Sequence, residues 1–224
     1  MMKVKCISHT IQPEKVCAIA ALTSTGKKIM DLEEIDLEKA RKLIRKIIDY
    51  GHYSVLEHAS FTFKIENISR VCSHQLVRHR LASYTQQSQR YVTFSDEIPE
   101  IVIPESIKRD KELKKKFMRF AAKSHELYKA MLERGIKAED SRYVLLNAFP
   151  TNIVVTMNAR ELLHFFELRL CERAQLEIRI LAKKMLQEVK KIAPSIFEKA
   201  GPRCVRLGYC PEGELGCGKY PPKK

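Results

Sequence analysis

A run of cationic and hydroxyl-bearing side chains, with no carboxylate among them, is the part of the sequence best suited to chemistry on an anionic ligand. It extends from Arg78 to Arg90 and reads RHRLASYTQQSQR, with three arginines and one histidine in thirteen residues. No Asp or Glu occurs between Glu66 and Asp96, although 30% of the chain is charged. A guanidinium presents a rigid fork of donors that matches phosphate or carboxylate. The run therefore predicts a binding site for something anionic.

Arginine and lysine are separated along the sequence, which strengthens this interpretation. No lysine occurs at 65–107 or 138–182, yet these two windows hold nine of the sixteen arginines: 70, 78, 80, 90, 142, 160, 169, 173 and 179. A solvated protein face usually mixes both residue types. The alternative, that a given arginine is partnered within a well-buried segment, stays open for each of them.

Several familiar site types are absent from the sequence. No glycine lies between Gly51 and Gly135, so neither a P-loop nor a GxGxxG turn exists there, and phosphates must be held by side chains. No nucleophile-elbow serine is present, and Cys72 is better explained as a core residue than as a nucleophile. The spacing of His52, Glu57 and His58 is not that of a zinc site, so no metal is predicted.

Composition bounds the class of protein. At 224 residues with 45% hydrophobic content, we expect one domain with a proper core. The net charge of +14 keeps a basic nucleic-acid-binding module as an alternative, although few aromatic residues accompany the arginines. Seven cysteines without a CxxC pair favour a reducing cytosol, and no segment has the 18 or so apolar residues of a membrane span. A cytoplasmic location is the expectation.

The first half of the chain contains the elements that must position the cationic run. Pro13 indicates a helix start and Asp36 an N-cap for an amphipathic helix that ends before Gly51. We expect a strand at Lys3–His9, a helix at Pro13–Leu22, a strand at Ala59–Ile65, a helix at Ser69–Arg80 with Arg70, His74 and Arg78 on one face, a loop at Leu81–Gln89 and a strand at Arg90–Phe94.

The second half is predicted to be mostly helical. A long helix at Lys108–Arg134, stopped by Gly135, is expected to turn inward its residues Leu113, Phe117, Phe120, Leu127, Met131 and Leu132. A helix is expected at Ala138–Asn147, a strand at Thr151–Met157 and a helix from Ala174 to Pro194. Between the last two, Asn158 and Glu161 form a capping box that begins another helix. Its cationic stripe consists of Arg160, His164, Arg169 and Arg173. The tail at 201–224 holds five of the eight glycines and is expected to be irregular; its Cys204, Cys210 and Cys217 are compatible with metal binding, loose thiols or a disulfide.

Three segments resemble one enzyme family. Arg78, His79 and Arg80, followed by Ser88 and Arg90, stand as in the signature of the flavin-dependent thymidylate synthases. GHYSVLEHASFTF at 51–63 and NARELLHFFELRL at 158–170 also resemble segments of that family, and the likeness extends from about Val4 to Gly201.

The resemblance implies an α+β fold, with a mixed or antiparallel sheet core and flanking long helices, in a single domain at 1–200 followed by the tail at 201–224. It implies a homotetramer with active sites at subunit interfaces, and no nucleic-acid or membrane partner. The reaction implied is the methylation of dUMP to dTMP, with 5,10-methylenetetrahydrofolate as carbon donor and NADPH as reductant through FAD. A covalent enzyme nucleophile is not part of it.

The resemblance also assigns residues. Arg169 takes the catalytic position, against the uracil edge, and His52 lies near the folate and flavin entrance. FAD is expected to contact Ser54, Arg78, His79, Arg80, Gln86, Asn158, Ala159, Arg160 and His164. The nucleotide dUMP is expected to contact Gln75, Leu76, Val77, Arg78, Gln86, Gln87, Ser88, Gln89, Arg90, Arg142 and Arg169. The chain departs from the family pattern at Gln86, Gln89, His164 and Arg173, where Glu, Gly, Asn and His are common.

Overall fold

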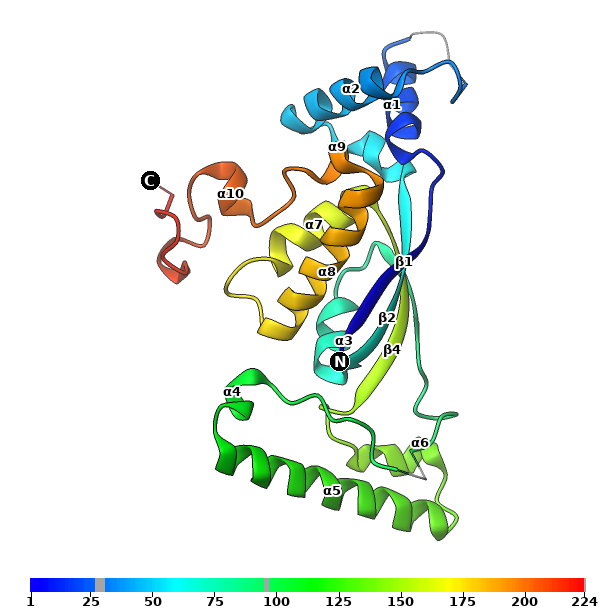
Figure 1. The fold of residues 1–224 in the computed structure, drawn as a ribbon, viewed down its shortest axis with the longest axis vertical. Coiled ribbons are helices and arrows are strands. Elements are labelled where there is room, and N and C mark those ends of the chain that lie inside the picture. Colours follow the sequence, from blue (N-terminus) through cyan, green and yellow to red (C-terminus); the bar gives the residue numbers. More distant parts are fainter. Residues whose placement is uncertain (27–30, 95–96, 224) are drawn as a thin grey trace. The chain divides into compact units, whose positions relative to one another are not determined.

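The computed structural model describes residues 1–26, 31–94 and 97–223 (Figure 1). The chain forms two compact units, and each draws on separate stretches of sequence. The first unit comprises residues 1–3, 65–78 and 85–154, and the second comprises residues 4–64, 79–84 and 155–224. The cationic run at 78–90 is therefore divided between the two units, because Arg78 belongs to the first unit and His79 to the second.

A four-stranded sheet has the order β1-β2-β4-β3, formed by β1 (Lys3–His9), β2 (Ser60–Ser69), β4 (Pro150–Asn158) and β3 (Ala82–Gln86). The strands are antiparallel: the amide of Thr10, after β1, donates to Ser60 at the start of β2, and the amide of Ala159, after β4, donates to Ala59 just before β2. On β2 the side chains of Phe61, Phe63 and Ile65 are fully buried while Lys64 is exposed, as the period of two in the sequence predicts.

The second unit contains most of the helices, and α7 lies beside both α8 and η1 (Figure 1). Its core includes Phe61, Phe166 and Phe197, whose rings meet edge to face with centroids 5.5 and 6.0 Å apart. The helices of this unit are α1 (Pro13–Ser24), α2 (Leu37–Asp49), η1 (Tyr53–His58), α7 (Ala159–Arg169), α8 (Leu176–Ile192), α9 (Pro194–Phe197), α10 (Arg203–Leu207) and η3 (Gly213–Leu215).

The first unit is built around one long helix, α5, drawn in green in Figure 1. Its buried cluster joins Ile101, Ala121 and Phe149, with Phe94 and Phe117 packed against it. The helices of this unit are α3 (Arg70–Leu76), α4 (Glu105–Lys108), α5 (Lys111–Glu133), α6 (Ala138–Ser141) and η2 (Arg142–Val144).

The predicted class, α+β, is confirmed, and so are several local predictions. The carboxylate of Asp36 accepts from the amide of Lys39, and the amide oxygen of Asn158 accepts from that of Glu161, which are the predicted N-caps. Gly51 and Gly135 follow their helices with φ of 77° and 79°, the left-handed conformation that glycine adopts at little cost. None of the helices in the described part of the chain is both long and apolar enough to cross a membrane.

Other predictions are wrong. The strand lies at Ala82–Gln86, where a loop was predicted, because this segment pairs along β4. Arg90–Phe94 is not a strand, because the amide of Val92 donates to Ser88 O and that of Arg90 to Ser88 Oγ, which curls the chain into a turn.

Three predicted helices also end differently. The helix predicted at Ser69–Arg80 ends at Leu76, so Arg78 does not share its face with Arg70. The helix predicted at 138–147 is a single turn followed by the short η2, since Leu145 and Leu146 turn into the Phe149 cluster. Helix α7 ends at Arg169, so Arg173 is not part of a continuous helical stripe.

The inward face predicted for α5 is right for Phe117, which packs against the buried cluster, and wrong for three other residues. Leu113, Phe120 and Leu127 are 51%, 62% and 52% exposed. The helix buries a different face, formed by Ala121, Ser124, His125 and Tyr128, because Ser124 Oγ donates to Val144 O and the His125 ring bonds to Phe94 O. A helix with two apolar faces does not indicate by periodicity alone which one is covered.

Candidate active site

The buried imidazole of His79 is the centre of a polar cluster in the second unit. Its side chain is bonded on both nitrogens: Nδ1 lies 3.0 Å from Glu161 Oε1, and Arg169 Nε donates to Nε2 over 3.1 Å. Because the Arg169 N–H can only donate, Nε2 must carry the lone pair, and Nδ1 must carry the proton that Glu161 accepts. The contacts therefore define a neutral imidazole in a single tautomer.

Electrostatics agree with this assignment. Burial lowers the pKa of His79, the hydrogen bond that it donates to Glu161 raises this pKa, and the positive charge of Arg169 lowers it again. A group with an ordinary pKa of about 6.5 is then neutral at physiological pH. Glu161 and Arg169 thus carry the formal charges of the trio, and His79 connects them without adding one.

Helix α7 supplies both partners of His79 and one wall of its pocket. Residues four apart lie on the same face of a helix, so Glu161, Phe165 and Arg169 project together. The ring of Phe165 meets that of His79 edge to face at 4.9 Å between centroids. The N-cap at Asn158 fixes where this face begins, because the helix starts one residue later. Local helix signals therefore position the catalytic candidate Arg169.

Tyr84, on β3 and in the same unit, bonds to the backbone of His79. Its hydroxyl donates to the carbonyl of His79 over 2.7 Å. Burial raises the pKa of the Tyr84 phenol, so it stays protonated and remains a donor. The segment between the two residues is closed into a small loop, which carries the exposed Arg80.

Exposed donors also occur on the elements around His79, Glu161 and Arg169. Arg160 on α7 forms an ion pair with Glu57 on η1, with Nη1 2.5 Å from Oε1, and the exposed Ser54 lies on the same 3₁₀ helix. His52 is exposed just before η1, and His164 is exposed on α7 with its ring 5.7 Å from that of His79. The side-chain oxygen of Asn158 accepts from the amide of Glu161 in the cap of α7.

A separate polar cluster forms in the first unit, at the end of β3. Side-chain amides hold this cluster together. Nε2 of Gln86 donates to Ser73 Oγ over 3.0 Å and to Thr151 Oγ1 over 3.1 Å. Nδ2 of Asn152 donates to Gln87 Oε1 over 3.0 Å. The backbone amide of Gln87 also donates to Asn152 O over 2.9 Å. These bonds fix the two glutamines before the turn at Ser88–Arg90.

Guanidinium groups gather beside that turn. Arg90 Nη2 lies 2.8 Å from Glu139 Oε2, and Arg142 Nε donates to the carbonyl of Glu139 over 3.0 Å. Burial lowers the pKa of Arg70, and the positive charge of Arg142 lowers it further. Like charges held this close favour an anion among them, and Glu139 supplies only one carboxylate.

The residues predicted from the resemblance fall into these two clusters. All the residues expected to contact the nucleotide lie in the first unit except Arg169, and those expected to contact the flavin lie in the second except Arg78 and Gln86. Leu76 and Ala159 are fully buried, and the Ala159 amide is bonded to Ala59 O, so both face the core. Arg78 and Val77 are exposed after α3, while Gln75 and Gln89 are half-buried.

Some residues of these clusters were not predicted as site residues, among them Glu161, Tyr84 and Arg70. Glu161 was recognised only for its place in the capping box, although its spacing to Phe165 and Arg169 marks one helix face. Nothing in the sequence marks Tyr84. Within 1–26, 31–94 and 97–223, no three His, Cys, Asp or Glu side chains stand ready as a metal-binding group.

Comparison with known proteins identifies the family. Residues 5–195 match the family described as thymidylate synthase complementing protein. The flavin-dependent thymidylate synthase of Pyrococcus abyssi is 51% identical over 98% of this chain and 94% of its own length, and that of Pyrococcus furiosus is 50% identical over 100% and 96%. The Geobacter sulfurreducens enzyme of the same name is 51% identical over 97% of this chain and 94% of its own.

A solved structure agrees. The flavin-dependent thymidylate synthase of Helicobacter pylori, complexed with FAD and dUMP, superposes with a TM-score of 0.72 at 26% identity, over 89% of this chain and 99% of that one. The fold, the matched family and relatives at half identity over nearly the whole chain lead to one conclusion: the chain belongs to the family of flavin-dependent thymidylate synthases.

Proposed function

We propose that this chain, a thymidylate synthase acting on dUMP, draws its one-carbon unit from 5,10-methylenetetrahydrofolate and its reducing equivalents from NADPH through bound FAD. The observation that supports the proposal is the trio of Glu161, neutral His79 and Arg169, in which the guanidinium is held by a bond to the imidazole.

The exposed donors of the second unit suit FAD. Ser54, Arg80, Arg160 and His164 are exposed and offer hydroxyl, guanidinium and imidazole donors, the groups that bind a diphosphate and a ribityl chain. FAD supplies the reducing chemistry when bound, and the protein residues bind and orient it. Arg160 is now paired with Glu57, so this carboxylate holds the guanidinium in place until an anion competes for it. We propose His52 at the entrance for folate and flavin.

The arginine cluster of the first unit suits the phosphate of dUMP. Arg90 pairs with the carboxylate of Glu139, Arg142 bonds to the backbone carbonyl of the same residue, and the charge of Arg142 acts on Arg70. A phosphate dianion would supply the negative charge that Glu139 alone does not. Gln75, Arg78 and the segment Gln86–Gln89 would complete contacts to the sugar and base. The bonds of Gln86 to Ser73 and Thr151 hold this segment ready, where the family often has Glu.

Arg169 is proposed as the catalytic residue. Its Nε donates to Nε2 of His79, and a guanidinium is a fork of donors from which a uracil carbonyl can accept. A guanidinium there stabilises negative charge on the pyrimidine ring, so the ring can act as a carbon nucleophile. No enzyme nucleophile is needed, and Cys72 is fully buried.

A homotetramer with active sites between subunits completes the proposal, with guanidinium groups from more than one chain meeting the ligands. The exposed apolar stripe of α5, formed by Leu113, Phe120 and Leu127 at seven-residue spacing, supports self-association. The proposed catalytic domain is residues 1–200, with 201–224 as an appended tail.

The test is a flavin and turnover measurement on the purified chain. We expect yellow protein that oxidises NADPH, at a rate that responds to dUMP, and that forms dTMP when methylenetetrahydrofolate is added. Colourless protein that takes up no added FAD, and instead binds DNA with a steep salt dependence, would contradict the proposal and favour a nucleic-acid-binding module.

A further inference from the structure

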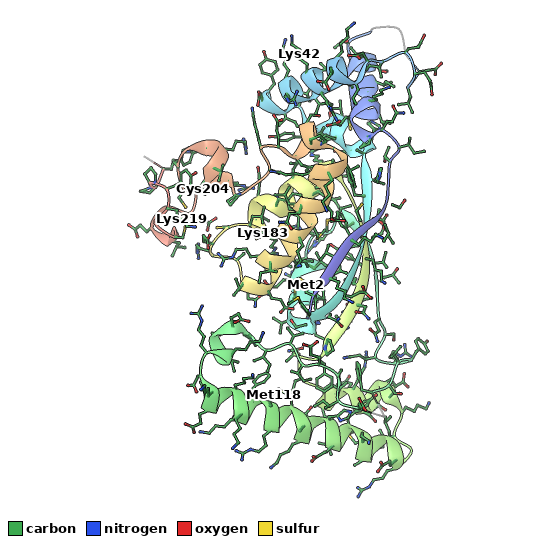
Figure 2. The ribbon with its side chains drawn as sticks, in the orientation of Figure 1. Met2, Lys42, Met118, Lys183, Cys204 and Lys219 are labelled. Carbon is green, nitrogen blue, oxygen red and sulfur yellow. The ribbon has the colours of Figure 1, made fainter. Side chains whose placement is uncertain are left out.

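Four cysteines gather where the C-terminal tail meets the end of α7. Cys204 lies on α10, Cys210 and Cys217 follow it in the tail, and Cys171 comes two residues after the last residue of α7. Figure 2 labels Cys204 and Lys219 on this tail segment. All four belong to the second unit, and none forms a disulfide. The sequence indicated only the three cysteines of the tail, and Cys171 is added by the fold.

Ion pairs bring the tail to the segment that holds Cys171. Arg203 Nε and Arg206 Nη2, which flank Cys204, each lie 3.1 Å from an oxygen of Glu167. Lys219 Nζ lies 2.7 Å from Glu172 Oε1, and Arg173 Nη1 lies 2.8 Å from Glu212 Oε2. Three parts of the tail, at 203–206, 212 and 219, are thus paired with residues 167–173. Each part lies within two residues of Cys204, Cys210 or Cys217 in the sequence.

These ion pairs do not explain why the tail is ordered. They are partly exposed, and such pairs contribute about 0–1 kcal/mol each. Cys210 is the single buried residue within 201–223, and the apolar Val205 and Leu215 are 56% and 68% exposed. A segment below about 40 residues without an apolar core generally needs a disulfide or a metal ion to hold its shape.

The backbone is shaped around the sulfur atoms. The amide of Cys210 donates to Pro221 O over 2.6 Å, which closes the tail into a loop that contains Cys217. A Cβ at Gly216 would lie 3.1 Å from Cys210 Sγ, so the absence of a side chain lets the chain pass close to this thiol. Gly218, on the other side of Cys217, has φ of 81°, which only glycine adopts readily.

The thiols are also within electrostatic reach of one another. Partial burial raises the pKa of Cys204, and the thiols of Cys171, Cys210 and Cys217 raise it further. The Cys204 thiol therefore lies close enough to the other three thiols for their charges to act on it. Four thiolates around one ion form a common structural site for Zn²⁺, a soft enough cation to prefer sulfur.

We propose that Cys171, Cys204, Cys210 and Cys217 bind one thiophilic divalent cation such as Zn²⁺, which fastens the tail to the end of α7. Because no three such ligands stand ready in the described residues, binding must draw the sulfur atoms together. The glycines at 216 and 218 make that movement easy for Cys217. The cation is structural, with no water position needed, and the inference does not depend on thymidylate synthesis.

The experiment is a Co²⁺ titration of the reduced, full-length chain after removal of metal. We expect one Co²⁺ per chain, with thiolate-to-metal charge-transfer absorption and the visible bands of tetrahedral coordination, and displacement by Zn²⁺. Cys217→Ser should weaken binding by more than about 100-fold, since even changes to groups around metal ligands cost 10–100-fold. Cys217 is exposed, so this variant should fold, which its circular dichroism would verify.

Cys6→Ser on β1 is the matched control, because this thiol neighbours Ser8 and Glu188 and none of the four cysteines. It should bind Co²⁺ as the parent does. A parent chain that shows no thiolate absorption while all seven thiols react with a thiol reagent would overturn the proposal. So would a chain purified without reductant that has lost four reactive thiols to two disulfides and cannot take up Co²⁺ after reduction.

Discussion

Replacement of Glu161 by Gln isolates the electrostatic part of the His79 cluster. Glutamine has nearly the shape of glutamate and keeps an oxygen that can accept from Nδ1 of His79, but it removes the charge. The N-cap of α7 uses the backbone amide of residue 161, so the substitution leaves it intact. The substitution weakens the electrostatic preference for the tautomer with its proton on Nδ1, in which Nε2 accepts from Arg169.

The magnitude follows from burial. The side chains of His79 and Glu161 are only 3% and 6% exposed, so solvent screens their bond little. A hydrogen bond to a charged group contributes about 1.5–3 kcal/mol and a neutral one about 0.5–1.5. The difference, about 1–2 kcal/mol, corresponds to roughly a 5- to 30-fold loss of the state in which Arg169 is correctly held. We expect the turnover number for dTMP formation to fall by this factor, with little change in dUMP affinity.

The assay combines steady-state turnover with nitrogen NMR of the imidazole, which reports the tautomer directly. In the parent chain the Nδ1–H tautomer should dominate, and in Glu161→Gln both should be populated. Glu167→Gln is the control, because this carboxylate lies on the same helix but binds Arg203 and Arg206 instead. Unchanged turnover in Glu161→Gln, with the tautomer mixture altered as expected, would refute the link between His79 and Arg169.

Three further predictions test other parts of the site. Arg90→Ala should weaken dUMP binding by about tenfold without loss of FAD, because the substitution removes a partly exposed charge-assisted contact to phosphate. Isothermal titration measures the dUMP affinity, with Arg109→Ala as the control. Equal affinities of the two variants would exclude Arg90 from the phosphate site. Asn158→Ala should cost about 1 kcal/mol through loss of the cap and lower the melting temperature by about 2–4 °C, seen by calorimetry. The pKa of His79 is lowered in the folded chain, so the unfolded chain takes up the proton first as the pH falls. The free energy of unfolding should therefore fall below about pH 6.5, by at most about 1.4 kcal/mol per pH unit. Urea midpoints measured between pH 7.5 and 5.5 should show this slope, and the His79→Gln variant should lack it.

Local signals in the sequence predicted well the elements that depend on neighbouring residues. The caps at Asp36 and Asn158 and the stops at Gly51 and Gly135 are bonds or conformations within one turn of chain, and they are where the sequence places them. The alternating strand at Phe61–Ile65 is predictable for the same reason, since its period of two depends on the strand alone.

Tertiary contacts decided the rest. Tyr91, Val92 and Phe94 have strand-forming side chains, yet the bonds at Ser88 make a turn, while the polar Ala82–Gln86 becomes a strand because β4 offers it a partner. His79 leaves the helix predicted for it and pairs instead with Glu161, 82 residues away. The exposed face of α5 is a similar case, because which of two apolar faces is buried depends on where Val144 and Phe94 lie.

The most direct test of the account is the rate of dTMP formation by Arg169→Ala with its flavin absorbance measured in the same sample. Arg169 is held by His79 and proposed to stabilise charge on the uracil ring, so its loss should lower turnover by about 10²- to 10³-fold. Bound flavin should remain, because Ser54, Arg80 and Arg160 are unchanged. A variant that keeps its flavin and forms dTMP at the parent rate would contradict the role assigned to Arg169.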